Sequence, residues 1–244
     1  MPDPVPIFAS VVDPTPDARD EKYGRPLLLE AGPMVWAIDL STMPSSEQLQ
    51  WLSGEEEERA DRFHQDKDRT RYLAAHVALR ELLALQCKQA PGEQHLMKDA
   101  YGKWRMEGAT DWDFSMSYAE NIGLIAIVSD CQVGVDIEMR QDIDDVAELA
   151  DFAFAAEEKE ELFRLARPEI SLAFLRGWTR KEACLKALGT GLHFPPADFH
   201  TGIVAQHSHV RGPFVGDLQV QNFDVGEKFV AAWALFRSGA QPAR

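Results

Sequence analysis

Two long helical segments, each followed by a glycine-containing loop and then by strands, set the strongest limit on how this chain folds. Apolar periodicity predicts the first helix over 67–88 and the second over 169–188. Gly189 and Gly191 follow the second segment, where a helix is expected to end. The repeated order predicts an α+β fold of two similar halves that meet near residue 133.

The first 33 residues are expected to form a separate arm. Six of the 14 prolines lie within 1–26. Proline blocks helix and removes backbone donors, so this stretch predicts an extended arm over the surface or a partly disordered leader. The rest of the chain divides into an N-terminal α+β half, 34–133, and a C-terminal α+β half, 134–244.

Composition excludes several classes of protein. The 244 residues include 40 acidic and 25 basic side chains, and the resulting formal charge of -15 argues against broad binding to nucleic acid or anionic membrane. The sequence contains no apolar run long enough to span a membrane and no secretory signal. Three widely spaced cysteines predict reduced thiols, not a disulfide framework or a zinc site. We therefore expect a cytoplasmic globular protein.

Alternating residues in VGVDIE, at 133–138, predict a strand with one polar face. Strand periodicity places Asp136 and Glu138 together, opposite Val133, Val135 and Ile137. Two neighbouring carboxylates repel each other unless a cation or hydrogen-bond donors lie between them. Oxygen ligands of this kind suit Mg²⁺ or Mn²⁺ better than zinc. Taken alone, the pair is more typical of a solvated strand edge than of a metal site.

A second polar pattern lies within the predicted helix over 169–188. Trp178, Glu182 and Lys186 recur every four residues and therefore share one stripe. A Glu–Lys pair at this spacing is common on exposed helix surfaces, but the tryptophan indicates partial burial. A partly buried pair could supply a third metal ligand and a cation for phosphate.

Two other polar patterns favour solvated surfaces. Arg69, His76 and Arg80 share one stripe of the first long helix, which indicates its solvent-facing side. The acidic run at 55–58 follows Ser53, a predicted helix cap, and opposes the positive end of the helix dipole.

Together, VGVDIE and WTRKEACLK, at 178–186, resemble the paired signature of the 4'-phosphopantetheinyl transferases of the surfactin-synthetase-activating type. AYGKW, at 100–104, is similar to the family's YGKP turn, and FSMSYAENIGLIAIV, at 114–128, is similar to its FN(I/L)SHS strand pair. The resemblance covers roughly 45–195. It implies a monomer whose two α+β halves are related by pseudo-two-fold symmetry.

The resemblance implies transfer of the phosphopantetheine arm of coenzyme A to a serine of an apo acyl or peptidyl carrier protein, with Mg²⁺ and release of 3',5'-ADP. It implies that Asp136, Glu138 and Glu182 hold the metal ion. Glu182 would also act as general base, and Lys186 would stabilise the departing phosphate. The implied substrate contacts are Arg59, Arg71, Lys103, Ser117, Tyr118, Lys181 and Lys186.

Four positions depart from the family's pattern. Tyr118 replaces the histidine of SHS and Ala119 the serine after it, while Glu56 replaces a basic residue and Trp104 the proline of the YGKP turn. Tyrosine can donate a hydrogen bond to phosphate but carries no positive charge, which predicts weaker discrimination for the 3'-phosphate of coenzyme A. Two alternatives stay open. One is a metal-dependent phosphohydrolase of coenzyme A or nucleotides, and the other is a non-catalytic relative that binds coenzyme A or a carrier protein.

Overall fold

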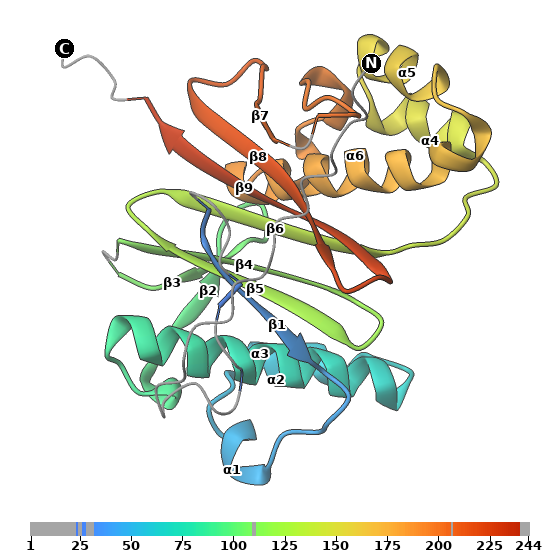
Figure 1. Ribbon diagram of the computed structural model, residues 1–244. Helices are drawn as coiled ribbons and strands as arrows, with labels where there is room; N and C mark the ends of the chain where they lie inside the picture. Colours follow the sequence, from blue (N-terminus) through green and yellow to red (C-terminus); the bar gives the residue numbers. More distant parts are fainter. Residues whose placement is uncertain (1–22, 24–25, 28–31, 109–110, 206, 240–244) are drawn as a thin grey trace.

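The structure, a computed structural model, describes residues 23, 26–27, 32–108, 111–205 and 207–239. Nearly all of the predicted arm, 1–33, lies outside these residues. The described chain forms four layers, in which two antiparallel sheets pack face to face and each is covered by one long helix (Figure 1). The fold is α+β, as predicted.

The first sheet has the strand order β1-β5-β4. Its strands are β1 (Met34–Asp39), β4 (Trp112–Ala119) and β5 (Ile122–Ser129). The outer face packs against α3 (Asp66–Cys87), where Leu79 and Leu82 meet Trp36 and Ile125. The strand pair joined at 119–121 is therefore confirmed. The remaining elements before β4 are α1 (Ser46–Leu49), α2 (Gly54–Asp61), a 3-10 turn (Pro91–Glu93), β2 (Leu96–Lys98) and β3 (Trp104–Met106).

The second sheet has the order β6-β9-β8-β7. Its strands are β6 (Gln132–Met139), β7 (His207–His209), β8 (Gly216–Val225) and β9 (Phe229–Ser238). Helix α6 (Arg167–Leu188) covers its outer face and ends at Gly189, whose φ of 70° confirms the predicted helix exit. Beside α6 lie α4 (Val146–Ala153) and α5 (Ala156–Phe163), and 3-10 turns follow it at Gly191–His193 and Pro196–Asp198 (Figure 1).

The core between the sheets explains the alternation in β6. Val133, Val135 and Ile137 pack with Leu124 of β5 and Trp233 of β9, so the apolar face of β6 points to the inter-sheet core. The other face, which carries Asp136, points toward α6. The proposed boundary near residue 133 falls at the start of β6; the symmetry between the halves stays a prediction. Among the described helices, none is long and apolar enough to cross a membrane.

The prediction of solvated polar faces on the first helices is wrong for three residues. Glu56, His76 and Arg80 are all buried. Glu56 Oε1 lies 2.7 Å from His76 Nδ1, and its Oε2 lies 2.5 Å from Arg80 Nη2. Glu56 also accepts a hydrogen bond from the backbone N–H of Ser53, the cap of α2. Each buried charge therefore has a partner, which is the condition under which such groups are tolerated inside a protein.

Candidate active site

The free edge of β6 is closed by side chains of β4. Val133 N donates to Asp113 Oδ2 at 2.7 Å, and Val135 N donates to Ser115 Oγ at 3.1 Å. Asp113, Ser115 and Ser117 occupy alternate positions of β4 and so point to one side of it. The backbone N–H groups on the edge of a sheet need hydrogen-bond acceptors, and Asp113 and Ser115 supply them for Val133 and Val135.

Asp136 and Lys186 lie at the centre of the site. Lys186 Nζ is 2.7 Å from Asp136 Oδ1 and 3.1 Å from Val135 O, and Ser117 Oγ donates to the same Oδ1 at 2.8 Å. The other carboxylate oxygen, Asp136 Oδ2, is buried and has no hydrogen-bond partner in the described part of the chain. A buried carboxylate oxygen without a donor is suited to ligate a hard cation.

Glu138 and Glu182 lie close enough to Asp136 and Lys186 to feel their charges. Burial raises the pKa of both carboxyl groups, the charge of Asp136 raises both further, and Lys186 opposes the rise. The indole N–H of Trp178 donates a hydrogen bond to Glu138. The helical stripe of Trp178, Glu182 and Lys186 therefore lies on the side of α6 that faces the acidic side of β6.

The donor set fits magnesium. Among the described residues, no three Asp, Glu, His or Cys side chains are arranged as a ready-made ion site. Mg²⁺, however, usually takes only one or two protein carboxylates and completes its shell with substrate phosphate and water. Asp136 offers an unpartnered oxygen for this purpose, and Glu138 and Glu182 are the nearby oxygen donors whose pKa values respond to its charge.

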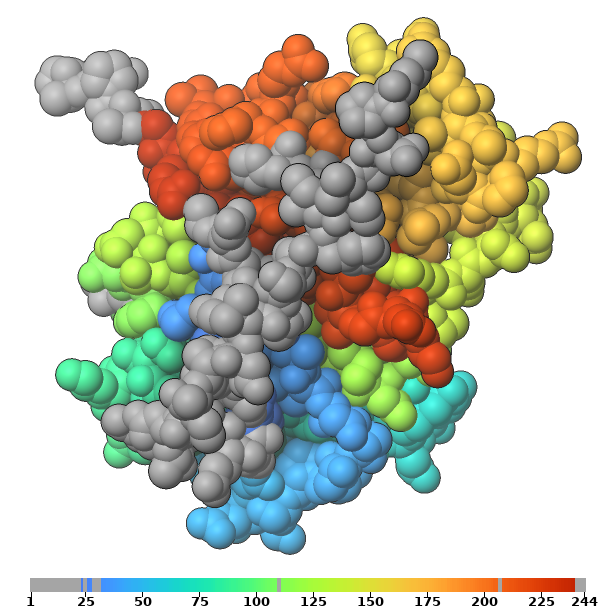
Figure 2. Space-filling model, viewed as in Figure 1, coloured from blue at the N-terminus to red at the C-terminus, as the bar shows by residue number. Residues whose placement is uncertain are grey.

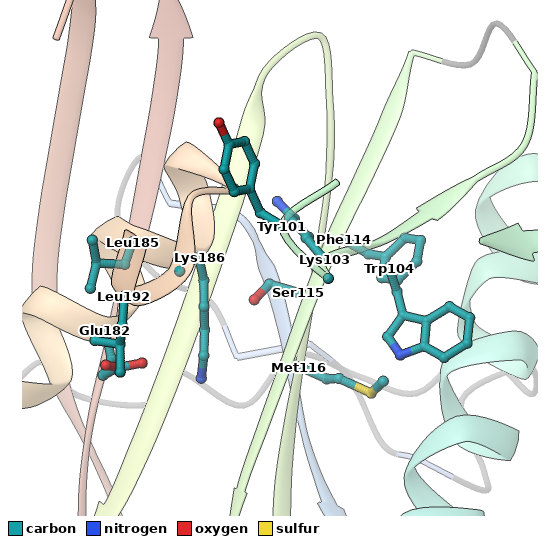
Figure 3. A pocket seen from close by; sticks show the side chains of 13 residues that line it. Tyr101, Lys103, Trp104, Phe114, Ser115, Met116, Glu182, Leu185, Lys186 and Leu192 are labelled. Atoms are coloured by element: carbon teal, nitrogen blue, oxygen red, sulfur yellow. The ribbon is translucent and has the colours of Figure 1, made fainter. Parts of the chain in front are cut away.

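A cavity of about 280 Å³ opens beside these residues. Figure 3 shows Glu182 and Lys186 on one side of it, Trp104 on the opposite side and Ser115 between them. The complete lining is Tyr101, Gly102, Lys103, Trp104, Phe114, Ser115, Met116, Glu182, Leu185, Lys186, Gly189, Gly191 and Leu192. The cavity thus combines an apolar interior with a small number of polar groups, as ligand sites commonly do.

Lys103 lines this cavity, and two groups of the protein hold its ammonium. Lys103 Nζ donates to Asp113 Oδ2 at 2.7 Å and to Val133 O at 2.9 Å. Burial lowers the pKa of Lys103, and the negative charge of Asp113 opposes that change. An ammonium has three donors, so one remains for a ligand in the cavity.

Arg59, Arg71 and Tyr118 form a second group, which does not line this cavity. Burial raises the pKa of the Tyr118 phenol, and the positive charges of Arg59 and Arg71 oppose that rise. Arg71 donates to Asn121 Oδ1 at 2.9 Å and to Glu120 Oε2 at 3.2 Å, while Arg59 is exposed. The structure therefore separates these predicted substrate contacts from Lys103 and Lys186.

The predicted substrate contact of Lys181 is wrong. Its side chain is fully buried, and its Nζ lies 2.5 Å from Glu158 Oε2. The same ammonium donates to Pro196 O at 2.9 Å and to Phe199 O. All three donors are therefore used inside the protein. The helical period turns Lys181 away from the stripe that contains Glu182, and that face of α6 packs against α5 and the segment after the helix.

The sequence pattern did not single out Asp113 and Ser115. The available signal was the run Asp113, Ser115, Ser117, in which polar residues alternate with Phe114 and Met116. Phe114 and Met116 belong to the core under α3. This alternation predicts that one face of the strand packs on a core and that the other face offers small polar side chains to a neighbouring strand. It does not predict that the neighbour is the edge of β6.

Comparison with known proteins supports the assignment that this geometry suggests. Residues 132–234 match the model of the 4'-phosphopantetheinyl transferase superfamily. The protein slr0495 of Synechocystis sp. is 32% identical over 66% of this chain and 66% of its own length, and the 4'-phosphopantetheinyl transferase HetI of Nostoc sp. is 33% identical over 65% and 69%.

The 4'-phosphopantetheinyl transferase Sfp of Bacillus subtilis is 26% identical over 62% of this chain and 66% of its own length. The match thus spans about two thirds of each of these relatives. These findings confirm the family that the two sequence motifs predict. The chain belongs to the 4'-phosphopantetheinyl transferase superfamily, a family of enzymes.

Proposed function

We propose that this protein transfers the 4'-phosphopantetheine arm of coenzyme A to a serine hydroxyl of an apo carrier protein in an Mg²⁺-dependent reaction. The observation that carries the proposal is the convergence of Asp136, Glu182 and Lys186 at one cavity. Asp136 offers a buried oxygen without a donor, and the other two residues line the cavity. Membership of the transferase family supports the same reaction.

In the proposed reaction, the serine oxygen bonds to the phosphorus of the phosphopantetheine arm, and the bond from that phosphorus to the bridging pyrophosphate oxygen breaks. The products are the phosphopantetheinyl carrier protein and 3',5'-ADP. Glu182 takes up the serine proton, a role that its raised pKa favours because it makes the carboxylate a stronger base. Lys186 donates a hydrogen bond to the phosphate that leaves.

Asp136 and Glu138, together with Glu182, would hold the magnesium ion, which supplies positive charge against the pyrophosphate as the phosphoanhydride breaks. Before that ion binds, Lys186 neutralises part of the negative charge on Asp136 through its 2.7 Å contact. Trp178 restrains Glu138 through the hydrogen bond from its indole N–H. The lining of the cavity also includes apolar side chains, among them Phe114 and Leu185.

Mass spectrometry of an apo carrier protein incubated with this protein, coenzyme A and Mg²⁺ tests the proposal. The expected result is a mass increase of one phosphopantetheine arm, which is lost when EDTA is added. Glu182→Gln is expected to reduce the rate by at least about 100-fold with the fold intact, the usual contribution of a general base. Glu57→Gln, at an exposed position of α2, is the matched control.

Each other outcome has a definite meaning. Consumption of coenzyme A without a mass increase, across acyl and peptidyl carriers, would replace the proposal by a phosphohydrolase. Neither consumption nor transfer would favour a relative that only binds coenzyme A or a carrier. An active Glu182→Gln variant would contradict the role given to this carboxylate.

A further inference from the structure

Lys103 and Lys186 are held on the edge of β6 in the same manner. Lys103 Nζ bonds to Val133 O, and Lys186 Nζ bonds to the oxygen of the residue two positions further on. Each ammonium also bonds to an aspartate at 2.7 Å, which is Asp113 for Lys103 and Asp136 for Lys186. Alternate residues of a strand lie roughly 7 Å apart, so the two ammonium groups are anchored at neighbouring points of one strand edge.

Asp113 holds more than the Lys103 ammonium. Its Oδ1 accepts from Arg105 Nη1 at 2.7 Å, and its Oδ2 accepts from both Lys103 Nζ and Val133 N at 2.7 Å. This carboxylate, whose side chain is only 9% exposed, therefore joins the Lys103 turn, β3 and β6. The proposed reaction gives Asp113 no role of its own, and the resemblance assigns it none.

The backbone of the turn that carries Lys103 is held by hydrogen bonds to Asp99. Asp99 Oδ1 accepts from the backbone N–H groups of Tyr101 and Lys103, both at 3.0 Å, and Asp99 Oδ2 accepts from Arg105 Nε at 3.2 Å. The backbone of the turn is thus fixed by Asp99, while the direction of the Lys103 side chain is fixed by Asp113. Arg105 bonds to both aspartates, but only Asp113 contacts the Lys103 ammonium, so a substitution at Asp113 acts on that side chain while Asp99 still holds the backbone of the turn.

We infer that Asp113 is a positioning residue, which holds the Lys103 ammonium at the cavity beside Lys186 so that the two cations meet a ligand with two adjacent anionic groups. The inference rests on the proposed function, in which the pyrophosphate of coenzyme A is such a ligand. Removing the charge of Asp113 leaves Lys103 and Arg105 without this anionic partner. Lys103 keeps its bond to Val133 O, Arg105 keeps its bond to Asp99, and the amide oxygen of Asn still accepts from Val133 N. We therefore expect Asp113→Asn to misplace the Lys103 side chain while the protein still folds.

The test is calorimetric binding of coenzyme A, in the presence of Mg²⁺, to the full chain. Asp113→Asn and Lys103→Met are each expected to weaken binding about tenfold, as loss of a charge-assisted hydrogen bond usually does. The double variant is expected to bind no more weakly than Lys103→Met, because Asp113 acts through Lys103. Asp111→Asn, an exposed neighbour on the same segment, is the control and is expected to bind as the wild type does.

Unchanged binding by Asp113→Asn, or a loss that adds to that of Lys103→Met, overturns the inference. If Asp113→Asn does not fold, Asp113→Glu is the second variant, because it keeps the charge and moves the carboxylate by one methylene. Asp113→Glu is expected to weaken coenzyme A binding as Asp113→Asn does, and to have no further effect when Lys103 is already Met. Unchanged affinity of Asp113→Glu overturns the inference. The measurement needs no carrier protein, so a wild type that binds coenzyme A but transfers nothing contradicts only the proposed function.

Discussion

Lys186 Nζ lies 2.7 Å from Asp136 Oδ1, across the contact between α6 and β6 and between residues 50 positions apart in the sequence. The ion pair joins the two motifs that define the site, one on the strand and one on the helix. Lys186 therefore has two roles. It neutralises a proposed metal ligand, and it faces the cavity where the phosphate would lie.

Lys186→Met is therefore expected to change two quantities in opposite directions. Divalent-cation affinity, measured by calorimetry with Mn²⁺ or Mg²⁺, should rise, because Asp136 loses its competing cation. The rate of transfer should fall by about 100-fold or more, since the departing phosphate loses its donor. A variant in which cation affinity and rate both fall would show that the lysine holds the site together instead of competing with the metal.

Gly134→Ala should separate β6 from α6. A Cβ at this position would lie 1.9 Å from Ala183 O and 2.6 Å from Ala187 N, so the helix would have to move. We expect a loss of at least about 1–3 kcal/mol in the free energy of unfolding, as for other overpacked cores, together with loss of transfer. Urea denaturation measures the first effect. Gly54→Ala is the control, because its Cβ would meet nothing within 4 Å; equal stability of the two variants would contradict the prediction.

Lys181→Met should lower the free energy of unfolding. The substitution leaves the buried Glu158 without its cation, and breaking such a pair costs about 3–5 kcal/mol. Adding Glu158→Gln should recover part of this loss, because no uncompensated charge then remains, while the amide oxygen can still accept from Thr201 N. Urea denaturation of the two variants checks this. A double variant less stable than Lys181→Met would refute the account of Lys181 as half of a structural pair.

Burial of the Glu56–His76 pair should make the protein lose stability on acidification. Burial lowers the pKa of His76 although Glu56 opposes the change. The unfolded chain therefore takes up this proton first, and the free energy of unfolding falls as the pH drops below about 6.5. Burial alone would raise the pKa of Glu56, but hydrogen bonds from His76, Arg80 and Ser53 lower it to about 2. Its contribution is therefore lost between about pH 4.5 and 2.

Urea denaturation at a series of pH values measures this dependence. His76→Asn can place an amide donor near Glu56 but does not titrate. We expect this variant to be less stable than the wild type at neutral pH and to show a flatter dependence between pH 7 and 5. An equally steep dependence would mean that other groups cause the effect.

Much of the fold could be predicted from the sequence because its signals are local. The strand pair around 119–121, the helix that ends at Gly189 and the alternation of β6 depend on turn chemistry and on residue periodicity. The spacing of Trp178, Glu182 and Lys186 likewise predicts one stripe. Their shared position on α6 follows from the helical period alone.

Tertiary structure decided which faces of the helices are buried and which side chains pack against them. Periodicity groups Arg69, His76 and Arg80 on one stripe but does not say that α2 brings Glu56 to His76 and Arg80. It also does not say which of Lys181 and Lys186 faces β6, because that depends on the close approach of α6 at Gly134. The sequence by itself therefore determined the local elements, the family motifs and the acidic and basic groups of the site. Only the packing of β4 against the edge of β6, and of α6 against the face of the sheet and against α5, decided that Asp113 lies beside the site and Lys181 lies outside it. Burial and pairing are properties of contacts between distant segments.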